Sequence, residues 1–277
     1  MNVGLALSGG GIRGIAHAGV IKALEEKNIE ITHIGGTSAG SVIAALYAIG
    51  YGPDNMYTLF KRYGKMFTNL DHITISKEIK NFLLRKKIKT SGFNAGENFE
   101  DLYNNLAFPK GIKKLTDVRM PIVMPTVDIN TSTKYILSSI ENKSKNWITD
   151  ISLGEAVRAS SSFPGVYKPF KYKGHLFVDG GLLENIPVNE IKLLGAEKVI
   201  AVKFSNNAKQ DKSNAIDIAI KALDIMGDEI SKNDLDGSDY VITIPVDGVG
   251  ILDLGKIEYC FNKGYEITKK FLEENRI

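Results

Sequence analysis

The chain has 277 residues, 43% of them hydrophobic and 24% charged, a balance typical of a globular protein with one large core. Its net charge of +3 is too small to indicate a nucleic-acid partner. This length predicts a single domain over residues 1–277. One cysteine excludes an internal disulfide framework, and the four histidines show no metal-ligand spacing, so we expect no metal site.

Strand-like and helix-like segments alternate along the chain, which predicts an α/β fold with a largely parallel sheet. In the first half, strands at 3–7 and 31–34 each run into a glycine cluster, and helices follow at 12–26 and 42–49. The strands expected further on lie at 121–128, 134–138, 167–172, 175–178, 198–204 and 240–244. The helices expected there lie at 153–159, 214–235 and 255–274.

Residues 54–108 differ in character from the sequence around them, because they mix aromatic residues with a run of bases. Between positions 61 and 92, nine lysines or arginines stand against two acids, a local charge of +7. Two interpretations stay open. The segment is a cap or interfacial surface that contacts anionic membrane lipid through Arg85, Lys86 and Lys87, or it is a solvated helix face beside a packed one.

The first glycine cluster, G-G-G-I-R-G at 9–14, follows a predicted strand and opens a predicted helix. Its backbone N–H groups and the helix N-terminus suit a dinucleotide pyrophosphate or, equally, the oxyanion of an acyl-transfer reaction. A dinucleotide site also needs an acid at the end of the second strand, which here runs into Gly35-Gly36-Thr37-Ser38. This disfavours the dinucleotide interpretation, while a plain turn without a ligand stays open.

The second glycine cluster, G-T-S-A-G at 36–40, matches the G-x-S-x-G pattern of a nucleophile elbow. Small residues two positions before and after the serine allow the tight turn that lifts its hydroxyl out of the sheet. The N-terminus of the following helix favours the negative charge that develops there. Ser38 is therefore the candidate nucleophile, and the alternative is a serine that only caps the helix.

A serine nucleophile needs a base, and the histidines are poor candidates. No histidine follows His175, where the usual order of a serine–acid–histidine triad would place one, and we expect His17 to support the first turn by packing and hydrogen bonding. Asp179 is the stronger candidate, because an apolar run before it and two glycines after it predict a position at the end of a strand. A plain Asp-Gly-Gly turn is the alternative.

Four motifs occur in order along the chain. They are G-G-G-I-R-G (9–14), G-T-S-A-G (36–40), A-S-S-S-F-P-G-V-Y-K-P (159–169) and D-G-G-L-L-E-N-I-P (179–187). In this combination the sequence resembles the patatin-like phospholipases, specifically the small bacterial members. The resemblance implies a three-layer α/β/α sandwich with a mainly parallel central sheet, a lipid or acyl-ester substrate and no cofactor.

The resemblance also implies a mechanism, a serine–aspartate dyad without histidine. Ser38 would attack the ester carbonyl, and Asp179 would deprotonate it and later activate the water that hydrolyses the acyl-serine. Backbone N–H groups around Gly10, Gly11 and Ile12 would form the oxyanion hole. The supporting motif residues are Gly9, Arg13 (which would steady the loop), Gly14, Gly36, Gly40, Gly180 and Gly181.

We therefore expect a hydrolase that releases fatty acid from phospholipid, lysophospholipid or similar lipid esters. The alternative from another class is a non-catalytic lipid-binding or regulatory protein that keeps this fold. The N-terminus lacks a basic region before a long apolar stretch, and no run of about eighteen apolar residues occurs, so we expect neither a signal peptide nor a membrane-spanning helix. A cytoplasmic protein, peripheral to the inner face of the membrane if the basic segment contacts lipid, fits this pattern.

Overall fold

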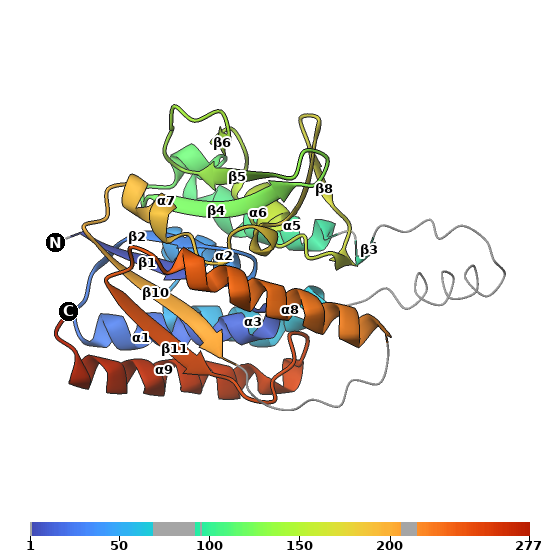
Figure 1. Ribbon diagram of the computed structural model, residues 1–277. Helices are drawn as coiled ribbons and strands as arrows, with labels where there is room; N and C mark the ends of the chain where they lie inside the picture. Colours follow the sequence, from blue (N-terminus) through green and yellow to red (C-terminus); the bar gives the residue numbers. More distant parts are fainter. Residues whose placement is uncertain (1, 69–91, 95, 206–214) are drawn as a thin grey trace.

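The computed structural model describes residues 2–68, 92–94, 96–205 and 215–277, which fold around one mixed, mostly parallel β-sheet (Figure 1). Its strands are β1 (Val3–Leu7), β2 (Ile31–Gly36), β4 (Ile122–Asp128), β5 (Thr133–Ser138), β6 (Trp147–Ile148), β8 (Phe170–Tyr172), β9 (His175–Asp179), β10 (Lys198–Ser205) and β11 (Tyr240–Pro245). They follow the order β11-β10-β1-β2-β4-β5-β6, and β9 pairs with both β4 and β8. A separate pair consists of β3 (Gly92–Asn94) and β7 (Gly165–Tyr167).

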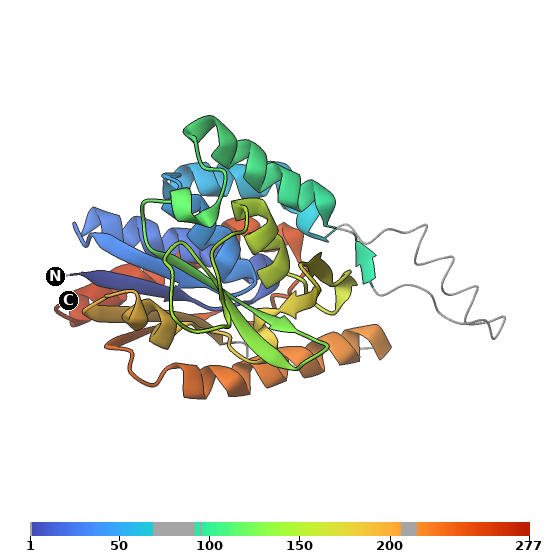
Figure 2. The ribbon, with the colours of Figure 1, turned by 90° about the horizontal axis from the view of Figure 1, so that it is seen from above.

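Helices cover both faces of the sheet (Figures 1 and 2). They are α1 (Ala16–Glu26), α2 (Ala39–Ala48), α3 (Pro53–Thr68), α5 (Glu97–Ala107), α6 (Leu153–Ser160), α7 (Val188–Leu193), α8 (Ala215–Asp234) and α9 (Ile257–Glu274). Along β1, Leu5 and Leu7 belong to the larger core with α1, α2 and α9, whereas Ala6 belongs to a smaller core with α7. This alternation is that of a strand buried on both faces, and it confirms the predicted three-layer α/β/α fold.

One edge of β4 changes partner along its length, and this change positions the candidate site. Ile122 and Val123 pair with β2 in parallel, whereas Thr126 to Asp128 pair with β9 in antiparallel fashion. The carboxyl ends of β2 and β9 therefore meet beside the middle of β4. Ser38 follows β2 directly, and Asp179 is the last residue of β9.

The predicted elements agree with the structure, with two local differences. The helix expected at 12–26 begins with a 3₁₀ turn, Gly11–Ile15, before α1, because Gly11 has a φ of 60° and the N–H of the next residue bonds outside the helix. The strand expected at 167–172 is divided into β7 and β8. Pro169 stands between them, and a proline has no N–H to contribute to a strand ladder.

The described ends of the 54–108 segment pack against the rest of the chain. Met56 and Phe60 of α3, and Phe99 and Tyr103 of α5, belong to the larger hydrophobic core. The basic residues predicted to contact lipid, Arg85, Lys86 and Lys87, lie outside the described residues. The interpretation of this segment as a cap or interfacial surface therefore stays a prediction, and so does the alternative of a solvated helix face.

Within the described ranges, none of the helices combines the length and the apolar character needed to cross a membrane.

Two helical glycines offer a test of how closely α1 and α9 pack. A Cβ on Gly264 of α9 would lie 2.0 Å from the carbonyl oxygen of Ala16, whereas a Cβ on Gly227 of α8 would meet no described atom within 4 Å. We expect Gly264→Ala to lower the free energy of unfolding by about 1–3 kcal/mol, because the helices must separate. Gly227→Ala should instead raise it by up to about 1 kcal/mol, through helix propensity alone. Urea unfolding of both variants measures the difference, and a stabilised Gly264→Ala would contradict the close packing.

Candidate active site

Ser38 lies in a strained turn between β2 and α2. Its backbone has a φ of 53° and a ψ of −120°, an unusual conformation for a residue other than glycine. A Cβ on Gly36 would lie 2.3 Å from the carbonyl carbon of Gly40, and one on Gly40 would lie 2.3 Å from the carbonyl oxygen of Leu7. Both glycines are therefore required by the turn. The side chain of Ser38 makes no capping hydrogen bond to α2, which disfavours the helix-cap interpretation.

Serines of the third motif hold the backbone of this turn. The Ser160 hydroxyl accepts a hydrogen bond from the N–H of Ser38 at 3.2 Å, and the Ser161 hydroxyl donates to the carbonyl of Ser38 at 3.2 Å. The hydroxyl of Ser41 donates to the same carbonyl at 2.6 Å. The third motif, at the end of α6, thus orients the elbow without supplying a side chain to react.

The first glycine cluster lies beside the elbow. A Cβ on Gly14 would come within 2.6 Å of the Cβ of Ala39, so the two glycine motifs are in direct contact. Arg13 donates from Nε to the carbonyl of Gly10 at 2.9 Å, which fixes the orientation of that peptide. Within the described residues, the N–H groups of Gly10 and Gly11 donate to no recorded acceptor.

Ile12 differs from the prediction. Its N–H donates to the carbonyl of Ile251 at 2.8 Å, so it is not available to an oxyanion in this structure. A Cβ on Gly11 would lie 2.2 Å from the same carbonyl oxygen, which shows how closely the loop before α9 covers this turn. Of the three predicted donors, the N–H groups of Gly10 and Gly11 alone lack a recorded acceptor among the described residues.

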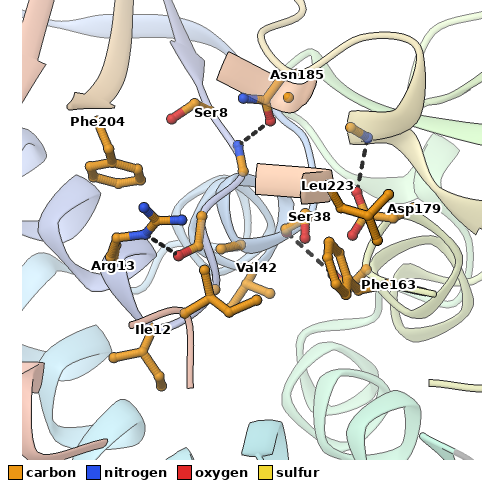
Figure 3. A pocket seen from close by; sticks show the side chains of 18 of the residues that line it. Ser8, Ile12, Arg13, Ser38, Val42, Phe163, Asp179, Asn185, Phe204 and Leu223 are labelled. Atoms are coloured by element: carbon orange, nitrogen blue, oxygen red, sulfur yellow. Dashed lines mark hydrogen bonds between the residues drawn. The ribbon is translucent and has the colours of Figure 1, made fainter. Parts of the chain in front are cut away.

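Asp179 ends β9 and is almost completely buried. Its Oδ1 accepts from the N–H of Gly181 at 2.9 Å, while Oδ2 has no hydrogen-bond partner within the described residues. Burial raises the pKa of Asp179 to about 6, although the nearby Ser38 hydroxyl and the Gly181 N–H both act to lower it. Figure 3 shows the Ser38 and Asp179 side chains next to each other. Gly180 is required beside them, because a Cβ there would lie 2.4 Å from the carbonyl oxygen of Pro125.

The histidines nearest to these motifs lie outside the cavity. His17 is fully buried, and its Nε2–H donates to the carbonyl of Ser8 at 2.8 Å, which confirms the prediction that it supports the first turn. Burial lowers the pKa of His17 to about 4, so its ring is neutral at physiological pH. His175 pairs through Nδ1 with Asp128 at 2.8 Å.

Asn185 is a functional candidate that the sequence analysis did not single out. Its Oδ1 accepts from the N–H of Gly9 at 2.9 Å, and its Nδ2 donates to the hydroxyl of Ser231 on α8 at 2.8 Å. Thr37 donates to the carbonyl of Glu184, the preceding residue, at 3.1 Å. The stretch after Asp179 therefore ties both glycine clusters to α8, and its presence in the fourth motif was the available signal.

These elements surround a cavity of about 300 Å³ (Figure 3). Ser38, Asp179 and the first glycine cluster lie in its wall, and among the described residues that line it none is a histidine. Apolar side chains form much of the cavity wall, namely Ile12, Val42, Phe60, Phe99, Phe163, Val166, Tyr167, Leu182, Phe204, Leu223, Ile251 and Leu252. A nucleophile, a buried carboxyl and unpaired N–H groups thus share one largely apolar space, an arrangement suited to acyl transfer.

The raised pKa of Asp179 predicts a pH-dependent cost to stability. Because the folded pKa of about 6 exceeds the ordinary 3.8, the folded chain binds more protons between these values. The free energy of unfolding therefore has its full value, as far as Asp179 is concerned, below about pH 4. It falls as the pH rises to about 6, and above that pH it is about 3 kcal/mol lower than at pH 4. We expect Asp179→Asn to have a larger free energy of unfolding than the unaltered chain at about pH 8, and a similar free energy of unfolding near pH 4.

Asp150 provides a control of opposite sign. Lys114 and Lys173 lower the pKa of Asp150 to about 2, so Asp150→Asn should show no increase in the free energy of unfolding at high pH. Urea unfolding at several pH values measures both variants. A stability gain of Asp179→Asn that is the same at both pH extremes would contradict the raised pKa.

Comparison with known proteins gives one family. The family described as "Patatin-like phospholipase" matches residues 5–191, which include all four motifs. Lysophospholipase nte1 of Aspergillus fumigatus is 29% identical over 98% of this chain and 18% of its own length. Lysophospholipase NTE1 of Debaryomyces hansenii is 33% identical over 73% of this chain and 12% of its own length. The chain thus spans less than a fifth of the length of these curated relatives.

Solved structures resemble this fold at lower sequence identity. VipD from Legionella pneumophila aligns with a TM-score of 0.57 and 17% identity, over 99% of this chain and 67% of VipD. A chain of the ExoU–SpcU complex from the Pseudomonas aeruginosa type III secretion system aligns with a TM-score of 0.53 and 19% identity. The alignment covers 99% of this chain and 51% of that chain of the complex. The family match over residues 5–191, together with this fold, identifies the chain as a member of the patatin-like phospholipase family.

Proposed function

We propose that this chain hydrolyses the acyl esters of phospholipids, lysophospholipids or similar lipids through an acyl-serine intermediate on a Ser38–Asp179 dyad. The observation that carries the proposal is the contact between a serine in a strained elbow and a buried carboxyl of raised pKa, in a cavity whose described lining contains no histidine. The names of the relatives, lysophospholipases, support the substrate class.

In the first half of the reaction, the ionised Asp179 carboxylate takes the proton of the Ser38 hydroxyl as Oγ bonds to the ester carbonyl carbon. The negative charge moves to the carbonyl oxygen, where the N–H groups of Gly10 and Gly11 can stabilise it. When the carbonyl re-forms, the alcohol part of the lipid leaves and takes the proton from Asp179. The fatty acid remains attached to Ser38.

In the second half, Asp179 takes a proton from a water molecule, and the water oxygen bonds to the acyl carbon. The same N–H groups face the oxyanion again. The bond to Ser38 then breaks, the serine oxygen regains a proton from Asp179, and the fatty acid is released. Asp179 returns to its ionised form, so the cycle needs no cofactor.

A carboxylate is ordinarily a weak base for a serine hydroxyl, and the burial of Asp179 reduces this mismatch. Its pKa of about 6 lies roughly two units above the ordinary value, while the group still ionises at neutral pH. The apolar wall of the cavity matches a hydrocarbon chain and excludes water around the ester, which strengthens the N–H contacts to the oxyanion.

The first test of this proposal is the loss of activity on removing either member of the dyad. We expect Ser38→Ala to lower kcat/KM by about 10⁴-fold or more, and Asp179→Asn to lower it severely. A fluorophosphonate probe should label the unaltered chain on Ser38 and should not label Ser38→Ala. A folded chain that binds lysophospholipid but is neither labelled nor active would instead be a non-catalytic lipid-binding protein.

The pH profile gives a second test, because the burial of Asp179 sets where the acid limb falls. An unburied aspartate would titrate far below histidine, but the raised pKa of Asp179 predicts an acid limb of kcat/KM near pH 6, close to a histidine value. Activity should fall as the pH drops through about 6. The limb should persist in His17→Gln and His175→Gln, and it should shift little with temperature, since carboxyl groups ionise with little enthalpy. A limb lost in either histidine variant would contradict the dyad.

Asn185 should act as a positioning residue through its bond to Gly9. We expect Asn185→Ala to lower kcat by roughly tenfold or more and to change KM little, because the oxyanion donors next to Gly9 lose their fixed orientation. Ser231→Ala, which removes the other partner of Asn185 and leaves the Gly9 contact, is the matched control and should have a smaller effect. Equal losses in kcat and in thermal stability for both variants would indicate a purely structural role.

A further inference from the structure

A group of polar side chains lies at the carboxyl ends of β1 and β10, at the side of the cavity under α8. Ser8 follows β1 and continues its pairing with β10, because the N–H of Ser8 donates to the carbonyl of Val202 at 3.0 Å. By alternation, Ser8 points to the same face as Ala6, and Lys203 and Ser205 point to the same face as Ala201. All three residues line the cavity that contains Ser38.

Ser8 has an unused hydroxyl in this place. The residue is 1% exposed, and its Oγ has no hydrogen-bond partner within the described residues. A buried hydroxyl without a partner is costly and is uncommon in folded proteins. Figure 3 shows Ser8 next to the Gly9–Asn185 hydrogen bond, close to the first glycine cluster. The hydroxyl therefore lacks a partner at the wall of the cavity, and a small movement of its side chain would bring it to a ligand there.

Lys203 is an uncompensated cation at the same place. It is half-buried, and no ion pair or hydrogen bond of its ammonium group is recorded among the described residues. Lys134, also half-buried, is paired by contrast: its Nζ lies 3.1 Å from Glu184 and 2.8 Å from Glu190. A lysine that is partly removed from water without an acid beside it favours an anion from outside the chain.

The other charged residues in the described lining are Arg13 of the first glycine cluster, Asp179, and Asp228 and Lys232 of α8. Lys232 pairs with Glu229, three residues earlier on the exposed side of the helix. Asp228 also lines the cavity and has an interaction of its own. Among the described residues here, Lys203 is thus a cation without a recorded ion pair, and Ser8 and Ser205 line the same cavity.

We propose that Ser8, Lys203 and Ser205 form a subsite for the phosphate of a lipid headgroup, while the acyl chain occupies the apolar part of the cavity. This inference rests on the proposed function, because the ester between the two parts must reach Ser38. A lysine ammonium is a point charge well suited to phosphate, and hydroxyl groups donate the additional hydrogen bonds that a phosphate accepts. A free phosphate ion shares this chemistry, so the test separates the two sources.

The test compares two substrates with the same acyl ester, a lysophosphatidylcholine and the monoacylglycerol that lacks its phosphate. We expect Lys203→Met to raise KM for the lysophosphatidylcholine about tenfold or more and to leave the monoacylglycerol rate unchanged. Lys203→Arg should keep most of the affinity, and Ser8→Ala should lose less than Lys203→Met. Lys232→Met, a cavity-lining lysine that is already paired, is the matched control and should behave as the unaltered chain.

Two further measurements distinguish a lipid headgroup from a free phosphate ion, and the subsite from the proposed hydrolytic function. Inorganic phosphate should inhibit at most weakly, and strong inhibition that depends on Lys203 would mean a free-anion site and would overturn the headgroup assignment. Glycerophosphocholine binding to Ser38→Ala, followed by calorimetry, tests the subsite without hydrolysis and should be lost on adding Lys203→Met. Binding that survives, or an equal loss on both substrates, overturns the subsite. Failure of the unaltered chain to hydrolyse either ester would contradict the proposed function alone.

Discussion

The burial of one carboxyl group without a cation beside it is the constraint on which the candidate site depends. Asp179 is shielded from water, receives a single backbone hydrogen bond, and has no charged group acting on its pKa. A salt-bridged aspartate would be stabilised but would be a poor base, since its pKa would fall. The fold instead tolerates a destabilising carboxylate at neutral pH, and the rest of the structure must hold that group in place.

The sheet holds it through the change of partner along β4. Because β2 leaves β4 where β9 joins it, two strand ends from distant parts of the chain meet in one gap, and each brings one polar residue. The glycines around them follow from the lack of space: a Cβ at 36, 40 or 180 would overlap backbone atoms. Asn185 then connects this gap to α8, so that the helix over the cavity and the first glycine cluster share one hydrogen-bonded support.

Local features of this architecture could be predicted, and long-range ones could not. The strands before each glycine cluster, the elbow at Ser38 and the strand-end position of Asp179 follow from short patterns of apolar residues and glycines. The hydrogen bond from Ile12 to Ile251 joins residues far apart in sequence, and no periodic pattern predicts it. One of the predicted oxyanion donors, the N–H of Ile12, therefore already donates to a backbone carbonyl. The pKa of Asp179 also depends on burial by elements far apart in sequence, so a value near that of histidine does not follow from the local pattern.

Asp179 and Lys203 line the same cavity with opposite charges, and neither has a recorded ion pair among the described residues. If the ammonium of Lys203 approached Asp179, the pair would satisfy both groups, the pKa of Asp179 would fall, and the base would be lost. Lys203 does not contribute to the pKa of Asp179, and Figure 3 shows the Gly9–Asn185 hydrogen bond between Ser8 and Ser38. Asn185 is neutral, so it can bridge the loop without screening either charge. A substrate with a phosphate at one end and an ester at the other could place the phosphate at Lys203 and the ester at Ser38, while Lys203 and Asp179 stay apart.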